Sequence, residues 1–324
     1  MTGSFQLDRD DRPAEFALAI HGGAGTIDDT VMSDAERSAH HAALRAALYA
    51  GRQCLADGAC AVAAVEAVVI ALEDCALFNA GHGACLSFAG RHELDAAIMD
   101  GTTLNCGAVA GVQQVRNPVR AARAVMDHSP HVLLAGAGAD AFATAEGLAP
   151  VDNAYFTTEL RRQQWQTVRN HQADDAADMF RFGTVGAVAR DSFGGLAAAT
   201  STGGVTAKRW GRIGDSPLIG AGTRADATCA ISCTGAGERF IQHGVAHEIS
   251  ARMRLAGQTL ADATAELLGG VLASPNGSGG LIGVDADGRI VLGSNTRGMY
   301  RGWTRSDSPA MTTAISREHR EHRK

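Results

Sequence analysis

The 324-residue sequence has little positive charge and lacks a long apolar run. It carries 29 Lys and Arg against 35 Asp and Glu, a net charge of −6, without a basic patch to offset it. This balance argues against nucleic acid as a partner, because phosphate backbones are bound mainly by clustered Lys and Arg. The longest apolar stretch, residues 59–72, is interrupted by Glu66 and is too short to cross a bilayer. We therefore expect neither nucleic-acid nor membrane partners.

Paired cysteines and a leader segment are missing too. The seven cysteines are an odd number, and none lies in C-x-x-C spacing, which is typical of reduced thiols rather than of a disulfide framework. Residues 2–15 are polar and acidic and do not resemble the apolar core of a signal peptide. The sequence predicts a cytoplasmic protein.

Three common functional patterns are incomplete or absent. Gly23 and Gly25 begin a dinucleotide-binding fingerprint, but its third glycine is missing, so a Rossmann-type oxidoreductase is only the third-ranked alternative. The G-x-S-x-G motif of serine hydrolases does not occur. His243 and His247 have the spacing of helical metal ligands, but the H-E-x-x-H order is missing. We interpret these two histidines as solvent-facing.

What the sequence does contain is a Gly- and Thr-rich stretch from residue 182 to 237. Thr184 and Thr202 flank two runs of Val and Ala around a turn signal at residues 192–195. This pattern predicts a buried hairpin with a hydroxyl at an end of each strand. A polar segment without Gly or Pro, residues 152–179, precedes the Gly183–Thr184 bond. Such a segment, leading to the start of a buried strand, is consistent with a bond that is to be cut.

The chemistry of that cut follows from the two residue types. Glycine permits a strained backbone, in which the Thr184 hydroxyl can attack the Gly183 carbonyl to form an ester. Hydrolysis of the ester would free Thr184 as a new N-terminus. An α-amine has a pKa of about 8, so it can act as the base for its own hydroxyl. A Gly-Thr pair alone more often just starts a strand, and the interpretation therefore needs further motifs.

Longer motifs of this kind run along almost the whole chain. In the second half they are FGTVGAVA (182–189), TSTGG (200–204), GRIGDSP (211–217), SCTGAGE (232–238), GSGG (277–280) and NTRGMY (295–300). In the first half they are HGGAG (21–25), LEDCALFNAG (72–81), HELDA (92–96) with MDG (99–101), and RNP (116–118) with AARAVM (121–126). Together they resemble the plant-type L-asparaginase and isoaspartyl peptidase family of N-terminal-nucleophile hydrolases.

The resemblance implies a fold and a maturation step. The implied fold is α/β (α+β), a four-layer αββα sandwich, with which strands and helices in both halves are compatible. It further implies one domain, residues 1–324, that cuts itself into an α chain 1–183 and a β chain 184–324. Residues 152–182 are then expected to be a flexible linker, and two cleaved αβ units are expected to form a homodimer.

Capping signals and periodicity predict individual elements. We expect helices at 33–55 and 59–74, a third that Asn117 caps and Pro118 starts, and others beginning near 238 and 259. We expect strands at 16–20, 95–99, 108–112 and 131–135, and a hairpin at 280–291. The helix from Glu238 would carry one apolar stripe of Ile241, Val245, Ile249 and Met253. Residues 317–324 form a mixed-charge tail that we expect to be disordered.

The family's catalytic roles carry over by resemblance. Thr184 would be the nucleophile and, through its freed amine, the base, and Thr202 would orient its hydroxyl. The Thr234 hydroxyl and the Gly235 N–H would form the oxyanion hole, where donors stabilise developing negative charge. Asn79 would support that site from the first half of the chain.

The substrate-binding roles carry over in the same way. Arg212 would bind the substrate α-carboxylate with two parallel hydrogen bonds, a geometry that lysine cannot reproduce. Asp215 and the Gly237 carbonyl would accept hydrogen bonds from the substrate ammonium, next to Thr234 and Gly235. The alternative for Arg212 and Asp215 is an ordinary surface ion pair.

The resemblance also implies a structural cation and no catalytic cofactor. A sodium ion would be wrapped by backbone carbonyls of the 72–82 loop and would hold Asn79 in place. The carbonyls would be those of Leu72, Glu73, Cys75, Phe78, Ala80 and His82. The alternative is an ordered loop filled by water.

The implied activity is hydrolysis of β-aspartyl amide bonds, in isoaspartyl dipeptides and L-asparagine, with release of L-aspartate. A glycosylasparaginase-type amidase is the near alternative, and it would need a wide leaving-group pocket. A non-catalytic binding protein of the same fold is a second alternative, from another functional class. Ala236 and the segment Lys208–Trp210 depart from the common family pattern, as does His82, so the leaving group stays open.

Overall fold

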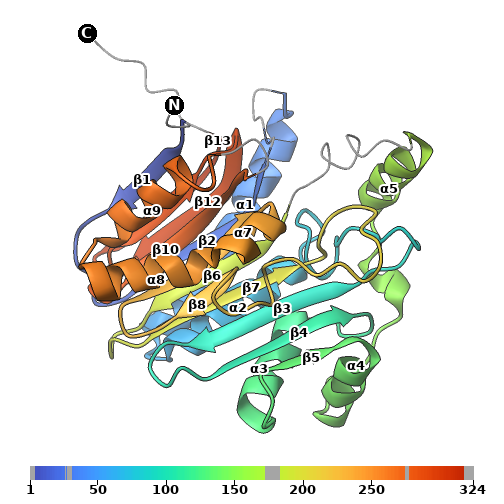
Figure 1. The fold of residues 1–324 in the computed structure, drawn as a ribbon, viewed down its shortest axis with the longest axis horizontal. Coiled ribbons are helices and arrows are strands. Elements are labelled where there is room, and N and C mark those ends of the chain that lie inside the picture. The colour runs from blue at the N-terminus through green and yellow to red at the C-terminus, as the bar shows by residue number, and fades with distance from the viewer. Residues whose placement is uncertain (1–3, 26, 28–30, 172–182, 274–276, 317–324) are drawn as a thin grey trace.

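The computed structural model describes residues 4–25, 27, 31–171, 183–273 and 277–316. The expected disordered tail, 317–324, lies outside these residues. Within them, two β-sheets pack face to face and each carries helices on its outer face (Figure 1). The chain therefore has the expected αββα sandwich.

The larger sheet has eight strands in the order β13-β12-β2-β6-β7-β3-β4-β5. Their bounds are β2 (Ala17–Gly25), β3 (Leu94–Asp100), β4 (Cys106–Val112), β5 (Leu133–Ala135), β6 (Val185–Arg190), β7 (Leu196–Thr202), β12 (Gly298–Arg305) and β13 (Ser308–Ser316). The smaller sheet has the order β1-β11-β10-β9-β8. Its strands are β1 (Gln6–Asp10), β8 (Thr223–Ala225), β9 (Cys229–Gly235), β10 (Gly279–Asp285) and β11 (Ile290–Ser294).

Helices cover both outer faces. The eight-stranded sheet packs against α1 (Asp34–Ala56), α2 (Ala61–Glu73), α3 (Pro118–His128) and α4 (Gly136–Ala145). The five-stranded sheet packs against α7 (Gly237–His243), α8 (Val245–Ala256) and α9 (Leu260–Gly269). In the described part of the chain, none of the helices is both long enough and apolar enough to pass through a membrane.

Alternation along the central strands builds two separate apolar layers. In β2, Leu18 and Ile20 pack with the helices α1 and α2, whereas Ala17 and Ala19 face the second sheet. Successive side chains of a strand point to opposite faces, so a strand buried on both faces is apolar throughout. Small residues on the inner face let the two sheets approach closely, which accounts for the Ala-rich composition.

Local sequence signals explain several helix starts, among them those of α1, α3 and α9. The capping box at α1 is complete, since the Ser33 hydroxyl accepts from the Glu36 N–H and the Glu36 carboxylate accepts from the Ser33 N–H. Helix α3 begins at Pro118 as predicted. The expected cap by Asn117 is wrong, because its amide donates instead to Asp74 at 3.1 Å.

Two other predictions are corrected by the structure. Most of the segment 152–171, expected as part of a flexible linker, is helical, with a 3-10 helix at Asn153–Phe156 and α5 at Glu159–His171. Phe156 and Arg161 are buried there, which anchors the segment. The predicted helix from Glu238 is divided into α7 and α8 at Gly244, whose φ of +53° is left-handed. Ile241 is consequently 37% exposed and does not share the apolar stripe.

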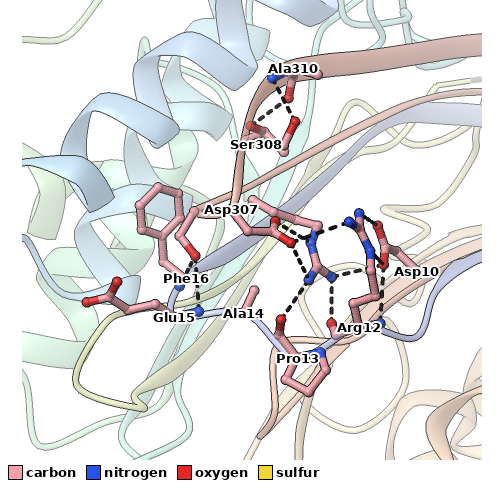
Figure 2. A network of polar contacts seen from close by, with 12 residues as sticks. Asp10, Arg12, Pro13, Ala14, Glu15, Phe16, Asp307, Ser308 and Ala310 are labelled. Carbon is pink, nitrogen blue, oxygen red and sulfur yellow. Dashed lines mark hydrogen bonds and ion pairs between the residues drawn. The ribbon is translucent and has the colours of Figure 1, made fainter.

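A network of polar contacts joins residues 10–16 to the turn between β12 and β13 (Figure 2), and a buried arginine lies in it. The Arg305 guanidinium is 2% exposed and donates to the carbonyls of Arg12 and Pro13 at 2.7 and 2.8 Å. It also pairs with Asp307 at 3.0 Å and with Asp10 at 3.2 Å. We call these five residues the Arg305 junction. It ties the segment before β2 to the turn between β12 and β13.

The two predicted fragments both contribute strands to each sheet. Strand β2 lies between β12 and β6, β3 pairs with β7, and β1 pairs with β11. Each of these pairings joins residues before 183 to residues after it. A cut at Gly183 would therefore leave two chains that share one core.

Candidate active site

Thr184 and Thr202 lie side by side at one end of the β6–β7 hairpin. Thr184 directly precedes β6, Thr202 is the last residue of β7, and Val185 pairs with Ser201. The Thr184 hydroxyl donates to Thr202 Oγ1 over 3.2 Å, and the same oxygen accepts from the Gly204 N–H at 3.0 Å. The fold thus brings together the two threonines that sequence analysis paired, and it orients the Thr184 hydroxyl.

Gly183 occupies a backbone conformation and a space that both require glycine. Its φ of +109° lies in the region that L side chains rarely adopt. A Cβ on Gly183 would lie 2.6 Å from Asn79 Cβ, and a Cβ on Gly23 would lie 2.6 Å from Gly183 Cα. The peptide preceding Thr184 is therefore held closely against Gly23 and Asn79, which accounts for a glycine of the HGGAG motif.

Asn79 is buried and makes hydrogen bonds that connect the two halves of the chain. Its Nδ2 donates to the Gly204 carbonyl at 2.7 Å, and its Oδ1 accepts from the Cys85 N–H at 2.7 Å. Its backbone carbonyl accepts from the Gly203 N–H at 3.0 Å. Asn79 therefore holds the turn that follows Thr202, and its second Nδ2 hydrogen can serve a further acceptor.

Strand β9 brings Thr234 and Gly235 to the same pocket as Thr184. Thr234 is 1% exposed, and its Oγ1 accepts from the Ala24 N–H at 3.3 Å, which leaves its hydroxyl hydrogen to donate. Gly235 has a φ of +148°, and a Cβ there would lie 2.5 Å from Gly279 Cα. Two donors, one hydroxyl and one N–H, are thus adjacent at the end of this strand.

Arg212 lines the pocket and is paired with a residue that sequence analysis did not assign to the site. Its Nε and Nη2 donate to the two carboxylate oxygens of Glu238 at 2.9 and 3.0 Å. The Arg212 side chain is 20% exposed and the Glu238 side chain is 63% exposed. Glu238 therefore satisfies Arg212 in the geometry expected for a substrate carboxylate.

Asp215 is a buried carboxylate with an unsatisfied oxygen. It is 3% exposed, and its Oδ2 has no hydrogen-bond partner among the described residues. Burial raises the pKa of Asp215 to about 7, although nearby Arg212 acts in the opposite direction. A Cβ on Gly237 would lie 3.0 Å from Asp215 Oδ1 and 2.8 Å from Arg212 Nη2, so glycine keeps this corner open. The corner borders Oδ1, and the unpartnered Oδ2 belongs to the same buried carboxylate, a combination that suits a ligand cation.

The pocket that joins these residues is small in the intact chain. It is lined by Gly183, Thr184, Thr202, Gly204, Val205, Arg212, Gly214, Asp215, Ser216, Thr234 and Gly235, and encloses about 20 Å³. This volume holds about one water molecule. A larger cavity of about 590 Å³ lies at the far end of the five-stranded sheet, away from these groups. Because Gly183 itself lines the small pocket, a cut after Gly183 would enlarge it.

The loop that precedes Asn79 fits a cation held by carbonyls. A Cβ on Gly83 would lie 2.7 Å from the carbonyl oxygens of both Ala76 and Phe78, and a Cβ on Gly81 would lie 2.4 Å from that of Glu73. The loop is therefore curled with its carbonyls inward. The Glu73 carbonyl accepts from the His82 N–H at 2.7 Å and keeps a second lone pair. Such oxygens suit a hard cation, and the expected ligand set stays a prediction.

The segment that departs from the family pattern has mixed placement. Lys208 is buried, and its ammonium donates to the Glu93 carbonyl at 2.7 Å. Trp210 is 96% exposed with a φ of +56°, and Arg209 stacks on Phe88 at 4.0 Å from the ring centroid. Arg209 and Trp210 therefore form a surface with Phe88, whereas Lys208 is buried. None of the three lines the pocket around Thr184. His243 and His247, by contrast, are exposed as predicted.

Sequence analysis missed two residues that contact the site. Glu238 closes the SCTGAGE motif, and its place beside Gly237 was the available signal. His21 opens the HGGAG motif, and its ring lies 3.1 Å from the Thr184 carbonyl. Neither could be assigned from spacing, because both act across strands that are distant in the chain.

Comparison with known proteins supports the motif-based resemblance. Residues 14–314 match the model of a family described as asparaginase. An isoaspartyl peptidase of Salmonella typhimurium is 48% identical over 310 residues, which cover 93% of this chain and 98% of the relative. An isoaspartyl peptidase of Escherichia coli is 47% identical, with 93% and 96% covered. A plant-type L-asparaginase of Pyrococcus furiosus is 39% identical over 300 residues, with 87% and 94% covered.

Proposed function

The chain belongs to the asparaginase family, and on this premise we propose that it hydrolyses β-aspartyl amide bonds and releases L-aspartate. Isoaspartyl dipeptides and L-asparagine are the substrates. One observation carries the proposal: the Thr184 hydroxyl, bonded to Thr202, faces the same pocket as Arg212 and the unsatisfied carboxylate of Asp215. A nucleophile, a guanidinium and a buried carboxylate are the three groups that an aspartyl substrate needs.

Maturation comes first. The Thr184 hydroxyl adds to the Gly183 carbonyl carbon, the C–N bond breaks, and the acyl group moves to the Thr184 oxygen with its amine freed. Water then hydrolyses the ester, which leaves a carboxylate on Gly183 and a free α-amine on Thr184. The positive φ of Gly183 and its close fit against Gly23 and Asn79 support this step.

Turnover then uses the new N-terminus. The Thr184 amine takes the proton of its own hydroxyl, and the oxygen attacks the β-carbonyl carbon of the substrate. The Thr234 hydroxyl and the Gly235 N–H stabilise the oxyanion. The substrate's amide bond breaks, and the leaving amine carries away a proton. Water then attacks the aspartyl ester, and L-aspartate leaves.

Substrate recognition divides between two charged groups. Arg212 binds the α-carboxylate of the substrate. In the intact chain, the Glu238 carboxylate accepts the hydrogen bonds that Arg212 would donate to it. The Asp215 carboxylate and the Gly237 carbonyl accept from the α-ammonium. These contacts fix the aspartyl part of the substrate and leave the amine side unspecified.

The remaining assignments belong to the same proposal. A sodium ion held by the 72–82 carbonyls would stiffen the loop that carries Asn79, without taking part in the chemistry. Free thiols at all seven cysteines, each within the described residues, support a cytoplasmic location. A homodimer of cleaved units stays a prediction, which light scattering tests.

The test combines mass with activity. Intact mass spectrometry of the purified protein should show two fragments, residues 1–183 and 184–324, without added protease. Aspartate release is then measured from β-Asp-Leu, L-asparagine and a glycosylated asparagine. Release from the first two supports the proposal, and release from the glycosylated substrate alone would replace it with a glycosylasparaginase. A cleaved protein that releases no aspartate from any of them would overturn it.

A further inference from the structure

A buried chain of polar side chains leads away from Thr184 into the space between the two sheets. His21 Nδ1 lies 3.1 Å from the Thr184 carbonyl oxygen, and His21 Nε2 lies 2.9 Å from Ser232 Oγ. Ser232 Oγ lies 2.7 Å from Thr200 Oγ1, which lies 2.7 Å from Thr223 Oγ1. All four side chains are fully buried. We call them the His21 chain.

The directions of the hydrogen bonds nearest to His21 follow from the contact between its Nδ1 and the Thr184 carbonyl. A carbonyl oxygen can only accept, so His21 Nδ1 must carry the hydrogen that it donates to Thr184. A neutral ring then leaves Nε2 as an acceptor, which Ser232 must serve with its hydroxyl hydrogen. Thr200 consequently donates to Ser232, in preference to the Gly222 carbonyl at 3.4 Å. Thr223 lies within hydrogen-bond distance of both Thr200 and the Ser216 carbonyl, at 2.7 and 3.0 Å, and its single hydrogen can serve either. Ser232 and Thr200 therefore support this tautomer of His21.

The ring is held neutral by its surroundings. Burial lowers the pKa of His21 to about 3, although the bond to the Thr184 carbonyl acts in the opposite direction. Both ring nitrogens are engaged in these hydrogen bonds. His21 is therefore not available as a general base, and that role is left to the Thr184 amine.

A glycine in the middle of a strand makes room for this arrangement. Gly186 pairs with His21 across β2 and β6. A Cβ on Gly186 would lie 2.0 Å from Ser232 Oγ and 2.5 Å from His21 Nε2. Its φ is not positive, so the backbone itself does not require glycine. The space requires it, because any side chain would occupy the path of the hydrogen bond between His21 and Ser232.

We infer that His21 is a positioning residue, which donates from Nδ1 to the Thr184 backbone carbonyl in a tautomer that Ser232 and Thr200 support. The inference rests on the proposed function of Thr184. Before the cut, the peptide bond to Gly183 restrains Thr184. After the cut that restraint is gone, and the hydrogen bond from His21 joins the contact with Thr202 and the pairing of β6 in fixing the nucleophile.

Two substitutions separate positioning from packing. His21→Asn can place an amide hydrogen where Nδ1 donates, whereas His21→Gln places its amide where Nε2 lies. We expect His21→Gln to lower kcat for β-Asp-Leu about 100-fold, the scale of a nucleophile displaced by about 1 Å. KM should change little, because Arg212 and Asp215 are untouched. His21→Asn should recover kcat to within about tenfold of the wild type.

The tautomer of His21 can be measured by NMR in a protein that has no catalytic activity. In ¹⁵N-labelled protein carrying Thr184→Ala, the His21 ring should show a protonated Nδ1 and an unprotonated Nε2, unchanged between pH 8 and pH 5. The His21→Gln variant identifies the signals. A protonated Nε2, or titration of the ring in this range, would overturn the inference even if the variants failed to fold.

The kinetic arm separates the two proposals. A wild-type protein that hydrolyses β-Asp-Leu, with His21→Gln keeping full kcat, would overturn the role of His21 and leave the proposed function standing. A cleaved wild type without hydrolysis would overturn the proposed function, while the ring spectrum still tests the tautomer. Equal losses in kcat for the Asn and Gln variants would indicate packing and contradict positioning.

Discussion

Two charged side chains are almost equally buried in this protein, and they differ in how well they are satisfied. Arg305 is 2% exposed and Asp215 is 3% exposed. All three guanidinium nitrogens of Arg305 contact carbonyl or carboxylate oxygens within the Arg305 junction. Asp215 Oδ2, by contrast, has no hydrogen-bond partner within the described residues. Burial alone therefore does not mark a functional site. At Asp215, burial coincides with an unsatisfied oxygen and with a place in the pocket that Thr184 lines.

The contrast has an energetic basis. Burying a charge costs free energy unless ion pairs and hydrogen bonds replace its water. The Arg305 junction recovers that cost in the folded chain and so serves folding. At Asp215 the cost is carried by the rest of the fold, and a substrate ammonium would offset it.

The largest expected effect is on activity, and it comes from removing the proposed nucleophile in the pocket that contains Asp215. Thr184→Ala deletes the hydroxyl that we propose both cuts the chain and attacks the substrate, so the chain should stay intact and hydrolysis should be abolished. Electrophoresis and aspartate release measure the two losses. Thr184→Ser keeps a hydroxyl and should cut slowly, which controls for folding. An intact wild-type chain that still turned over β-Asp-Leu would refute this mechanism.

Breaking the Arg305 junction should affect stability and spare catalysis. Arg305→Met leaves the carbonyls of Arg12 and Pro13 without a donor, and we expect a loss of about 2–3 kcal/mol in the free energy of unfolding. This is less than the roughly 3–5 kcal/mol typical of a broken buried pair, because Asp10 and Asp307 remain partly hydrated. Urea unfolding should be measured in the uncut Thr184→Ala chain, where two-state behaviour is easier to reach.

The neighbouring Arg12 supplies a matched control for the junction. Its side chain is 66% exposed, so Arg12→Met should leave the unfolding midpoint nearly unchanged. In the cleavable background, Arg305→Met should keep the wild-type kcat at a temperature below its unfolding transition. A loss of kcat in the folded Arg305→Met protein would contradict the view that the Arg305 junction serves stability and the Asp215 pocket serves catalysis.

Weakening the carboxylate clamp tests the other side of the comparison. Arg212→Lys keeps the charge but loses the two-pronged geometry, and kcat/KM should fall by about 1–3 kcal/mol, mainly through KM. Chain cutting should survive, because Gly183 is processed without that clamp. Steady-state kinetics with L-asparagine measure the change, and an unaltered KM would remove Arg212 from the site.

The pH dependence of product binding sharpens the assignment of Asp215. The pKa of Asp215 in the folded protein is about 7, above its ordinary value, so folding favours the protonated form of this carboxyl. In the free protein, the stability due to this group is therefore greatest at low pH and falls as pH rises toward 7. A bound ammonium needs the carboxylate, so the Kd for L-aspartate should rise about tenfold per pH unit below 7.

Calorimetry between pH 5 and pH 7 measures this slope, because the Thr184 amine stays largely protonated over that range. Asp215→Asn removes the titrating group and should flatten the profile while weakening binding overall. A steep slope that persists in Asp215→Asn would assign the titration to another group.

The smallest expected effect concerns Glu238. Since it satisfies Arg212 in the intact chain, it competes with the substrate carboxylate for the same donors. Glu238→Gln should lower KM by about two- to fivefold, the scale of an exposed ion pair. An increase in KM would indicate that Glu238 orients Arg212 and does not compete for it.

Much of this protein could be read from local sequence alone. The Val- and Ala-rich runs around residues 192–195 form the β6–β7 hairpin, and the Ser33–Glu36 capping box starts α1. The Gly183–Thr184 bond indicated Thr184 as the candidate nucleophile, and the ordered motifs indicated the family. These features are encoded over a few residues, through backbone preferences, capping and alternation, so they need no knowledge of distant partners.

Tertiary structure decided what depends on distant partners. Residues 159–171 looked like a polar linker, yet Arg161 is buried there and donates to the Gly83 carbonyl, 78 positions away. His21 and Ser232 are 211 positions apart, and their hydrogen bond exists because two sheets meet there. A polar side chain becomes costly or useful only when folding removes its water and supplies its partners. Which buried groups are satisfied, and which await a ligand, was therefore settled by the packing of the two sheets.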